Sequence, residues 1–245
     1  EQGEDSVWLH DFSLFGLKSG NSLTSALEVN FEQAFNAVWE GRVDDDRFNE
    51  LVVTAGLNWR DAALFRAYAA YMKQIQFAYS PEFLAGTLSQ HAEMCQQLLE
   101  YFRLRFDPTV AARARNGIAK QREQILSGID AVTNLAEDSV LRAYLNLMEA
   151  TQRTNYFQKD AEGNDKDYFS FKFIPGRIEG IPLPKPQFEI FVYSRRMEGV
   201  HLRGGKVARG GLRWSDRHED YRTEVLGLVK AQQVKNSVIV PVGAK

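Results

Sequence analysis

The stretch that decides the fold is residues 168–193, YFSFKFIPGRIEGIPLPKPQFEIFVY. Its two ends, residues 168–174 and 188–193, are rich in aromatic and β-branched residues, as β-strands are. The middle holds three prolines within residues 181–186, so this segment cannot be helical and reads as an extended connector. The stretch therefore predicts two strands joined by a non-helical linker.

The residues before this stretch follow a helical pattern. Ser80-Pro81 combines a capping residue with a proline at the first helical position, and Ser89 is a candidate start for a further helix that ends near Asp107-Pro108. We expect another helix over residues 141–151 and mainly helical structure up to about residue 155. Behind Asn58, a candidate N-cap, apolar residues recur at the spacing of one helix face, namely Leu64, Tyr68, Tyr71, Ile75 and Tyr79.

A change of period divides the chain into two regions. The polar segment 159–167 reads as an exposed loop between them. We predict a helical region over residues 1–165 and an α/β region over residues 166–245, which makes the chain α+β or α/β in class. The aromatic residues of the helical region are expected to lie in its core, namely Trp39, Trp59, Phe65, Tyr68 and Tyr71.

Composition is that of a soluble globular protein, with 44% hydrophobic and 25% charged residues. No window holds the roughly 18 uninterrupted apolar residues that a membrane span needs. Cys95 is the only cysteine, which excludes an internal disulfide and suggests a cytoplasmic location. Because residues 1–5 contain neither a methionine nor a signal pattern, we expect the chain to be part of a longer protein.

The net charge of −2 hides an asymmetry along the chain. Residues 195–245 hold eleven Lys or Arg against five Asp or Glu, whereas residues 1–194 hold 19 basic and 27 acidic residues. The basic segment is punctuated by glycines, which suggests an anionic ligand. A basic surface that pairs with the acidic part of the chain explains the charges equally well.

The sequence argues against a metal site, a phosphate loop, a dinucleotide fingerprint and an RNA-binding element. His91 and Cys95 are the only close histidine–thiol pair, and two ligands are too few for a metal, so we expect no metal site. The glycines near residues 204–205 and 210–211 form neither a phosphate loop nor a dinucleotide fingerprint after a strand. They resemble RNA-binding RGG elements only superficially, because such elements occur in repetitive tracts. We therefore expect no nucleic acid and no dinucleotide to bind this chain.

The informative run is residues 209–245. It opens with RGGLRW, residues 209–214, in which glycines expose backbone N–H groups beside guanidinium groups that can grip a carboxylate. A helix is expected over residues 221–235, with Asp216 and Glu219 at capping-box spacing. On that helix we expect Val225, Leu228 and Val229 to face inward, Lys230 to face solvent, and Gln232 and Lys235 to share one side.

The last residues of this run are expected to lie near the helix over residues 221–235. Residues 237–240 read as a short buried strand, and residues 241–245 as a turn that directs Lys245 outward. The helix and the turn would thus bring two lysines to one pocket.

Three ordered blocks in this run, residues 209–213, 232–237 and 241–245, resemble the substrate-binding signature of glutamate dehydrogenases. Residues 204–217, 153–157 and 188–194 resemble specifically the very large bacterial NAD-dependent class. The resemblance runs from about residue 140 to the end, and three blocks in order are far more specific than one glycine motif.

The resemblance implies a role for each matching residue. Lys245 matches the catalytic lysine, and Lys235 and Gln232 match residues that hold the substrate α-carboxylate, assisted by the backbone at Gly210. Arg209 stands where the small hexameric enzymes carry a lysine for the distal carboxylate.

That departure leaves two candidates, Arg209 and Lys206, for the distal contact. Arg213 is a further candidate for substrate binding. In this reading residues 166–245 are the beginning of an α/β glutamate-binding domain, and the preceding helices have a regulatory or assembly role.

The implied reaction is the reversible oxidative deamination of L-glutamate to 2-oxoglutarate and ammonia. NAD would be bound by a Rossmann domain outside this chain, so the chain alone should be inactive, and a homo-oligomer is expected. Two alternatives remain open. One is a non-catalytic helical interaction or oligomerisation module with a basic patch. The other is a leucine- or phenylalanine-type dehydrogenase, against which the cluster of cations argues, because such sites need an apolar pocket.

Overall fold

The computed structural model describes residues 24–111, 116–206, 209–235 and 243–244, with the side chains of residues 209, 233–235 and 243–244 left out of the description. The described residues between 24 and 150 are mainly helical, as predicted. Its helices are α1 (Ser25–Trp39), α2 (Glu50–Thr54), α3 (Trp59–Gln74), α4 (Pro81–Gln90), α5 (Ala92–Phe106), α7 (Ile118–Asp130) and α8 (Leu135–Ala150), with a 3₁₀ turn η1 (Arg47–Asn49) before α2.

Two of the predicted helix starts are confirmed by their capping bonds. The side chain of Asn58 accepts a hydrogen bond from the Asp61 amide at 2.8 Å, and that of Ser80 accepts one from the Phe83 amide at 3.2 Å. Each bond satisfies an amide that the first turn of a helix leaves without a partner.

Two other expectations about these helices are wrong. Ser89 lies inside α4, and α5 begins only after His91. Helix α3 ends at Gln74, because Gln76 takes a left-handed φ of 63° that a helix cannot accommodate, so Ile75 and Tyr79 lie beyond it.

The second half of the described chain forms one sheet. Its strands are β1 (Thr151–Thr154), β2 (Phe169–Phe173), β3 (Phe188–Tyr193), β4 (Glu198–Arg203), β5 (Arg209–Gly210) and β6 (Gly243–Ala244), in the order β1-β2-β3-β4-β6-β5. The two strands predicted from residues 168–193 are confirmed as β2 and β3, which pair antiparallel. The connector between them contains a 3₁₀ turn, η2 (Pro175–Arg177), and is not helical over residues 181–186. β1 begins where the predicted helix over residues 141–151 was expected to end.

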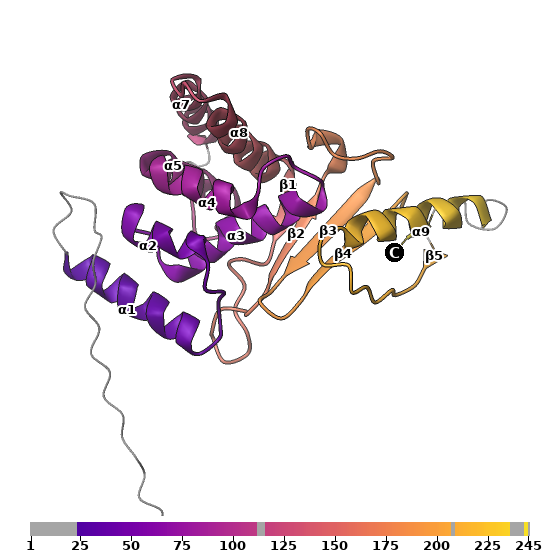
Figure 1. Cartoon of the computed structure of the whole chain (residues 1–245), viewed down its shortest axis with the longest axis horizontal. Helices are drawn as coiled ribbons and strands as arrows, with labels where there is room; N and C mark the ends of the chain where they lie inside the picture. The colour runs from indigo at the N-terminus through magenta and orange to yellow at the C-terminus, as the bar shows by residue number, and fades with distance from the viewer. Residues whose placement is uncertain (1–23, 112–115, 207–208, 236–242, 245) are drawn as a thin grey trace, which may run out of the picture.

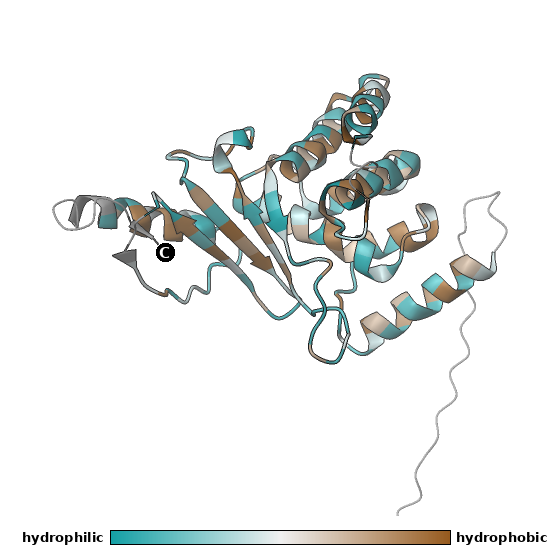
Figure 2. Cartoon of the chain, turned by 180° about the vertical axis from the view of Figure 1, so that it is seen from behind, coloured by the Kyte–Doolittle hydropathy of each residue, from teal (hydrophilic) through white to brown (hydrophobic). Residues whose placement is uncertain are grey.

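Helices α1–α5, α7 and α8 gather on one side of the molecule, and α9 (Tyr221–Lys235) lies along the far end of the sheet (Figure 1). None of the described helices is long and apolar enough to cross a membrane. Hydrophobic residues concentrate on the inner strands and on the helices beside them (Figure 2).

The core forms where the helices meet the sheet. Tyr71 of α3 packs on Phe173 and Phe191, with ring centroids 4.4 and 5.2 Å apart, and Tyr68 packs on Phe171 at 4.7 Å. A single cluster of buried apolar residues crosses residue 165, so the helices and the sheet share one core. The division of the chain near that residue stays a prediction about function.

The aromatic residues of the helical region do not all lie in this core. Phe65, Tyr68 and Tyr71 are fully buried, as predicted, and Trp59 is partly buried. The prediction is wrong for Trp39, whose side chain is 72% exposed at the end of α1.

Candidate functional site

The backbone brings residues 209–210 of the first sequence block beside residues 243–244 of the third. In β5, Arg209 and Gly210 pair in parallel with Gly243 and Ala244 of β6, and Ala244 also pairs with Arg203 of β4. The Gly-rich segment therefore lies directly beside the last residues before Lys245. Helix α9, which carries residues 232–235 of the second block, contacts β4, β5 and β6.

Helix α9 matches the predicted bounds of residues 221–235. Its inner face buries Val225 and Val229, as expected, and packs on Leu202 of β4. Leu226 is buried in place of Leu228, which is only half-buried, because the buried face of the helix runs through residues 222, 225, 226 and 229. Lys230 is exposed, as predicted.

The predicted capping box before α9 is wrong. The helix begins at Tyr221, so Asp220 and not Asp216 directly precedes it. Glu219 instead forms an ion pair with Lys73 of α3 at 2.7 Å. Asp220 forms an ion pair with Arg217.

The predicted lysines lie at the margin of the described residues. Lys235 is the last residue of α9 and its side chain is not described, whereas Lys245 lies outside the described residues. Gln232 is half-buried in the last turn of α9. Only the backbone of Arg209 is described, and Lys206 is exposed in the loop that follows β4. The choice between them for a distal carboxylate therefore stays a prediction.

Arg213 is held by a carboxylate of the helix. Its Nε donates to Oε1 of Glu224 at 2.8 Å, and the hydroxyl of Ser215 donates to Oε2 at 2.6 Å. The Ser215 hydrogen bond first, and the Arg213 bond second, hold the pKa of Glu224 below its ordinary value. Arg213 therefore ties the Gly-rich segment to α9, and its role in substrate binding stays a prediction.

The first turn of α9 is anchored by a buried ion pair that the sequence analysis missed. Arg222 donates from Nε and Nη2 to the two carboxylate oxygens of Glu189 in β3, both at 2.7 Å, and neither side chain is exposed. The hydroxyl of Tyr71 donates to the same carboxylate at 2.8 Å.

Burial alone would lower the pKa of Arg222, but the hydrogen bonds and charge of Glu189 outweigh that effect and raise it. Burial, and then the Glu189 charge, raise the pKa of the Tyr71 hydroxyl. Arg222 therefore remains charged and Tyr71 remains a donor. A signal was present in the sequence, because Arg222 stands three and four residues before buried Val225 and Leu226 on the apolar face.

The chain offers no metal centre where it is described. No group of three or more His, Cys, Asp or Glu side chains among those residues could hold an ion. His91 pairs with Glu137 at 2.7 Å, and burial raises the pKa of the Cys95 thiol, so the histidine–thiol pair is structural.

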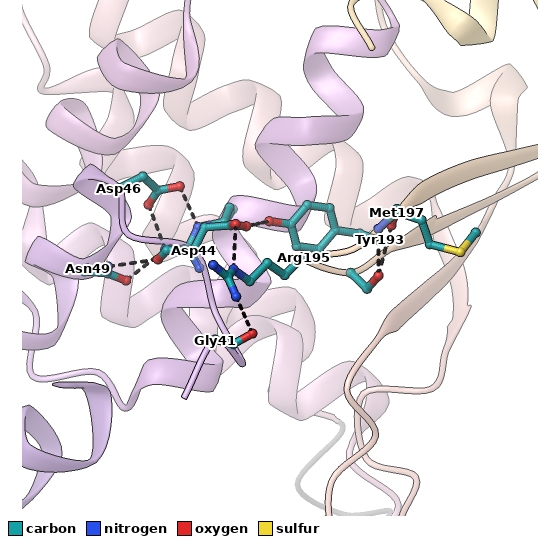
Figure 3. A network of polar contacts seen from close by, with 9 residues as sticks. Gly41, Asp44, Asp46, Asn49, Tyr193, Arg195 and Met197 are labelled. Atoms are coloured by element: carbon teal, nitrogen blue, oxygen red, sulfur yellow. Dashed lines mark hydrogen bonds and ion pairs between the residues drawn. The ribbon is translucent and has the colours of Figure 1, made fainter. Parts of the chain in front are cut away.

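A separate cavity of about 500 Å³ lies where the loop after α1 meets the β3–β4 turn. At its edge Asp44 accepts a hydrogen bond from the Tyr193 hydroxyl at 2.8 Å and faces Arg195, which also donates to the carbonyl of Gly41 (Figure 3). Its lining, within the described chain, includes no residue of α9, β5 or β6. It is therefore distinct from the pairing of β5 with β6 beside α9.

Comparisons with known proteins agree with the motifs. Residues 124–245 match the family model of the bacterial NAD-glutamate dehydrogenase catalytic domain, and residues 43–108 match glutamate dehydrogenase helical motif 3. Over its whole length the chain is 52% identical to the NAD-specific glutamate dehydrogenase of Halomonas elongata and 51% identical to that of Pseudomonas aeruginosa. It is 46% identical to that of Mycobacterium tuberculosis over 98% of the chain.

The chain spans about 15% of the length of each of these relatives. Both family models describe glutamate dehydrogenases, and the matches cover the helical and the sheet-forming parts of the chain alike. The chain therefore belongs to the family of bacterial NAD-specific glutamate dehydrogenases.

Proposed function

We propose that the whole protein catalyses the NAD-dependent oxidative deamination of L-glutamate to 2-oxoglutarate and ammonia, and that residues 166–245 supply the first part of its glutamate-binding domain. The observation that carries the proposal is the pairing of Arg209 and Gly210 with Gly243 and Ala244 beside α9. Residues 209–210 of the first block and 243–244 of the third thereby lie side by side in the sheet, and the helix that bears residues 232–235 of the second block contacts both strands.

The chemistry explains the residue types at this edge. Glutamate carries two carboxylates, so its site needs cations and backbone donors. We assign the α-carboxylate to Lys235, Gln232 and the backbone at Gly210. A lysine among other cations has a lowered pKa and can move protons at neutral pH, which is the role we assign to Lys245.

The cofactor is assigned to another part of the protein. The chain contains no glycine fingerprint that follows a strand and opens a helix, which a Rossmann site for NAD requires. We therefore assign no NAD-binding residue within residues 1–245.

The remaining assignments are proposals of the same kind. We infer a regulatory or assembly role for the helices of residues 1–165, in a homo-oligomer. The single cysteine, Cys95, is consistent with a reducing cytoplasmic compartment.

Two lysine substitutions in the full-length protein test the assignment. We expect Lys245→Ala to lower kcat severely and to leave 2-oxoglutarate binding intact, because a proton-transfer group acts mainly in the transition state. We expect Lys235→Ala to weaken 2-oxoglutarate binding by roughly 10- to 150-fold, the value of a charge-assisted hydrogen bond. Calorimetric titration with 2-oxoglutarate, beside steady-state kinetics, separates the two.

Lys230→Ala is the matched control, because Lys230 is an exposed lysine on the same helix. It should leave both measurements unchanged. Near-normal turnover by Lys245→Ala would refute the catalytic assignment, and faster turnover of leucine than of glutamate would refute the substrate.

A further inference from the structure

The N-terminal half of α9 is held by polar as well as apolar contacts. Tyr221 packs against the main core, and the apolar face of the helix adds three residues to a small separate cluster, namely Val225, Leu226 and Val229. The polar contacts, by contrast, join it to both β3 and α3.

Two side chains of α3 take part in these contacts. Gln74, itself buried, accepts a hydrogen bond from the Arg222 amide at 3.1 Å and donates one to the His218 carbonyl at 3.0 Å. It thereby satisfies an amide in the first turn of α9. Tyr71, one turn earlier on α3, holds the Glu189 carboxylate that binds Arg222.

We propose that Glu189 and Arg222, braced by Tyr71 and Gln74, are positioning residues that fix the direction of α9 and so place its substrate-binding end. The inference rests on the proposed function of Gln232 and Lys235. The planar guanidinium bound through two nitrogens fixes orientation as well as distance, which a single point charge does not do.

Stability alone is a poor explanation for this ion pair. Removing both charges from water costs several kcal/mol per ion, and apolar residues of similar size are often at least as stabilising. Nη1 of Arg222 is also buried without a hydrogen-bond partner in the described part of the chain, which adds to the cost. The geometry of the contact, rather than its net energy, is therefore what it contributes.

The length of α9 amplifies small errors at its start. Lys235 is thirteen residues beyond Arg222, so the two are separated by about 20 Å along the axis. A tilt of about 5° at Arg222 would move the far end by nearly 2 Å, and a displacement of about 1 Å is enough to cost a hundredfold in rate.

Two variants of the full-length protein test the inference. Arg222→Lys keeps the charge and removes the two-nitrogen contact, and we expect it to raise the KM for glutamate by about 10-fold or more. Tyr71→Phe removes one hydroxyl, and a rise of about 3-fold is expected. The KM for NAD should stay within about 2-fold in both.

Tyr68→Phe is the matched control. Tyr68 lies on the same helix, is equally buried, and shares one hydrogen bond, with Thr151, at 2.9 Å. We expect this variant to lower the Tm about as much as Tyr71→Phe does and to leave the KM for glutamate unchanged. If Arg222→Lys and Tyr71→Phe lower the Tm but change neither KM, the pair is only structural and the proposal is wrong.

Amide hydrogen exchange provides a measurement that does not depend on activity. Tyr71→Phe should speed exchange in residues 226–232 of α9 and leave α5 and α8 unchanged, whereas equal effects of Tyr68→Phe on α9 would overturn the proposal. This measurement tests the positioning role separately from the proposed function. A wild-type enzyme that does not use glutamate would refute the proposed function, but the exchange pattern of α9 would not change.

Discussion

At the scale of single residues, the carboxylate of Glu224 holds residues 213–215 against α9. It accepts hydrogen bonds from Ser215 and Arg213, and these hold its pKa below its ordinary value of 4.5. A carboxyl whose pKa is lower in the folded state contributes stability above its unfolded pKa, and this contribution is lost as the pH falls through the folded pKa. The hydrogen bonds between residues 213–215 and α9 should therefore weaken at acid pH.

We expect Glu224→Gln to reduce the dependence of the free energy of unfolding on pH between about pH 5 and pH 3. Urea unfolding at several pH values measures it. Glu162→Gln is the control, because it makes the same substitution at an exposed glutamate in the loop 159–167. A wild-type protein and a Glu224→Gln variant with parallel pH profiles would contradict the prediction.

At the scale of elements, local signals predicted what local interactions determine. Asn58 and Ser80 are caps because each accepts a bond from an amide three residues ahead. Ser89 is a serine like Ser80, but helical residues directly precede it, so α4 continues through Ser89. The end of α3 could not be predicted, because the left-handed turn at Gln76 occurs at a residue that rarely adopts it.

The two serines give a matched test. Ser80→Ala removes a capping bond and should lower the free energy of unfolding by about 1 kcal/mol. Ser89→Ala should have little effect or stabilise the chain slightly, because the Ser89 hydroxyl is buried without a hydrogen-bond partner among the described residues. Urea denaturation measures the free energy of unfolding of both variants. Equal losses would mean that the Ser80 capping bond does not stabilise the chain.

At the scale of the whole molecule, contacts between residues far apart in the sequence could not be predicted from it. Glu189 and Arg222 are 33 positions apart, and Tyr71 is 118 positions from Glu189. Nothing periodic in the sequence links them, since their pairing depends on α3 and α9 lying on one face of the sheet. For the same reason, the placement of β6 between β4 and β5 could be found only from the structure.

The shared core makes a prediction about how the chain unfolds. Phe171 of β2 is fully buried against Tyr68 of α3, so Phe171→Ala should lower the free energy of unfolding by about 3–5 kcal/mol. Because one cluster spans helices and sheet, amide exchange should accelerate together in α3 and in β2–β3. Phe188→Ala is the control, since Phe188 is only half-buried and outside that cluster, and its loss should be smaller and confined to the sheet. If Phe171→Ala exposed the strands while α3 and α5 kept their protection, the helices would fold as a separate unit, and residue 165 would mark a boundary of folding as well as of function.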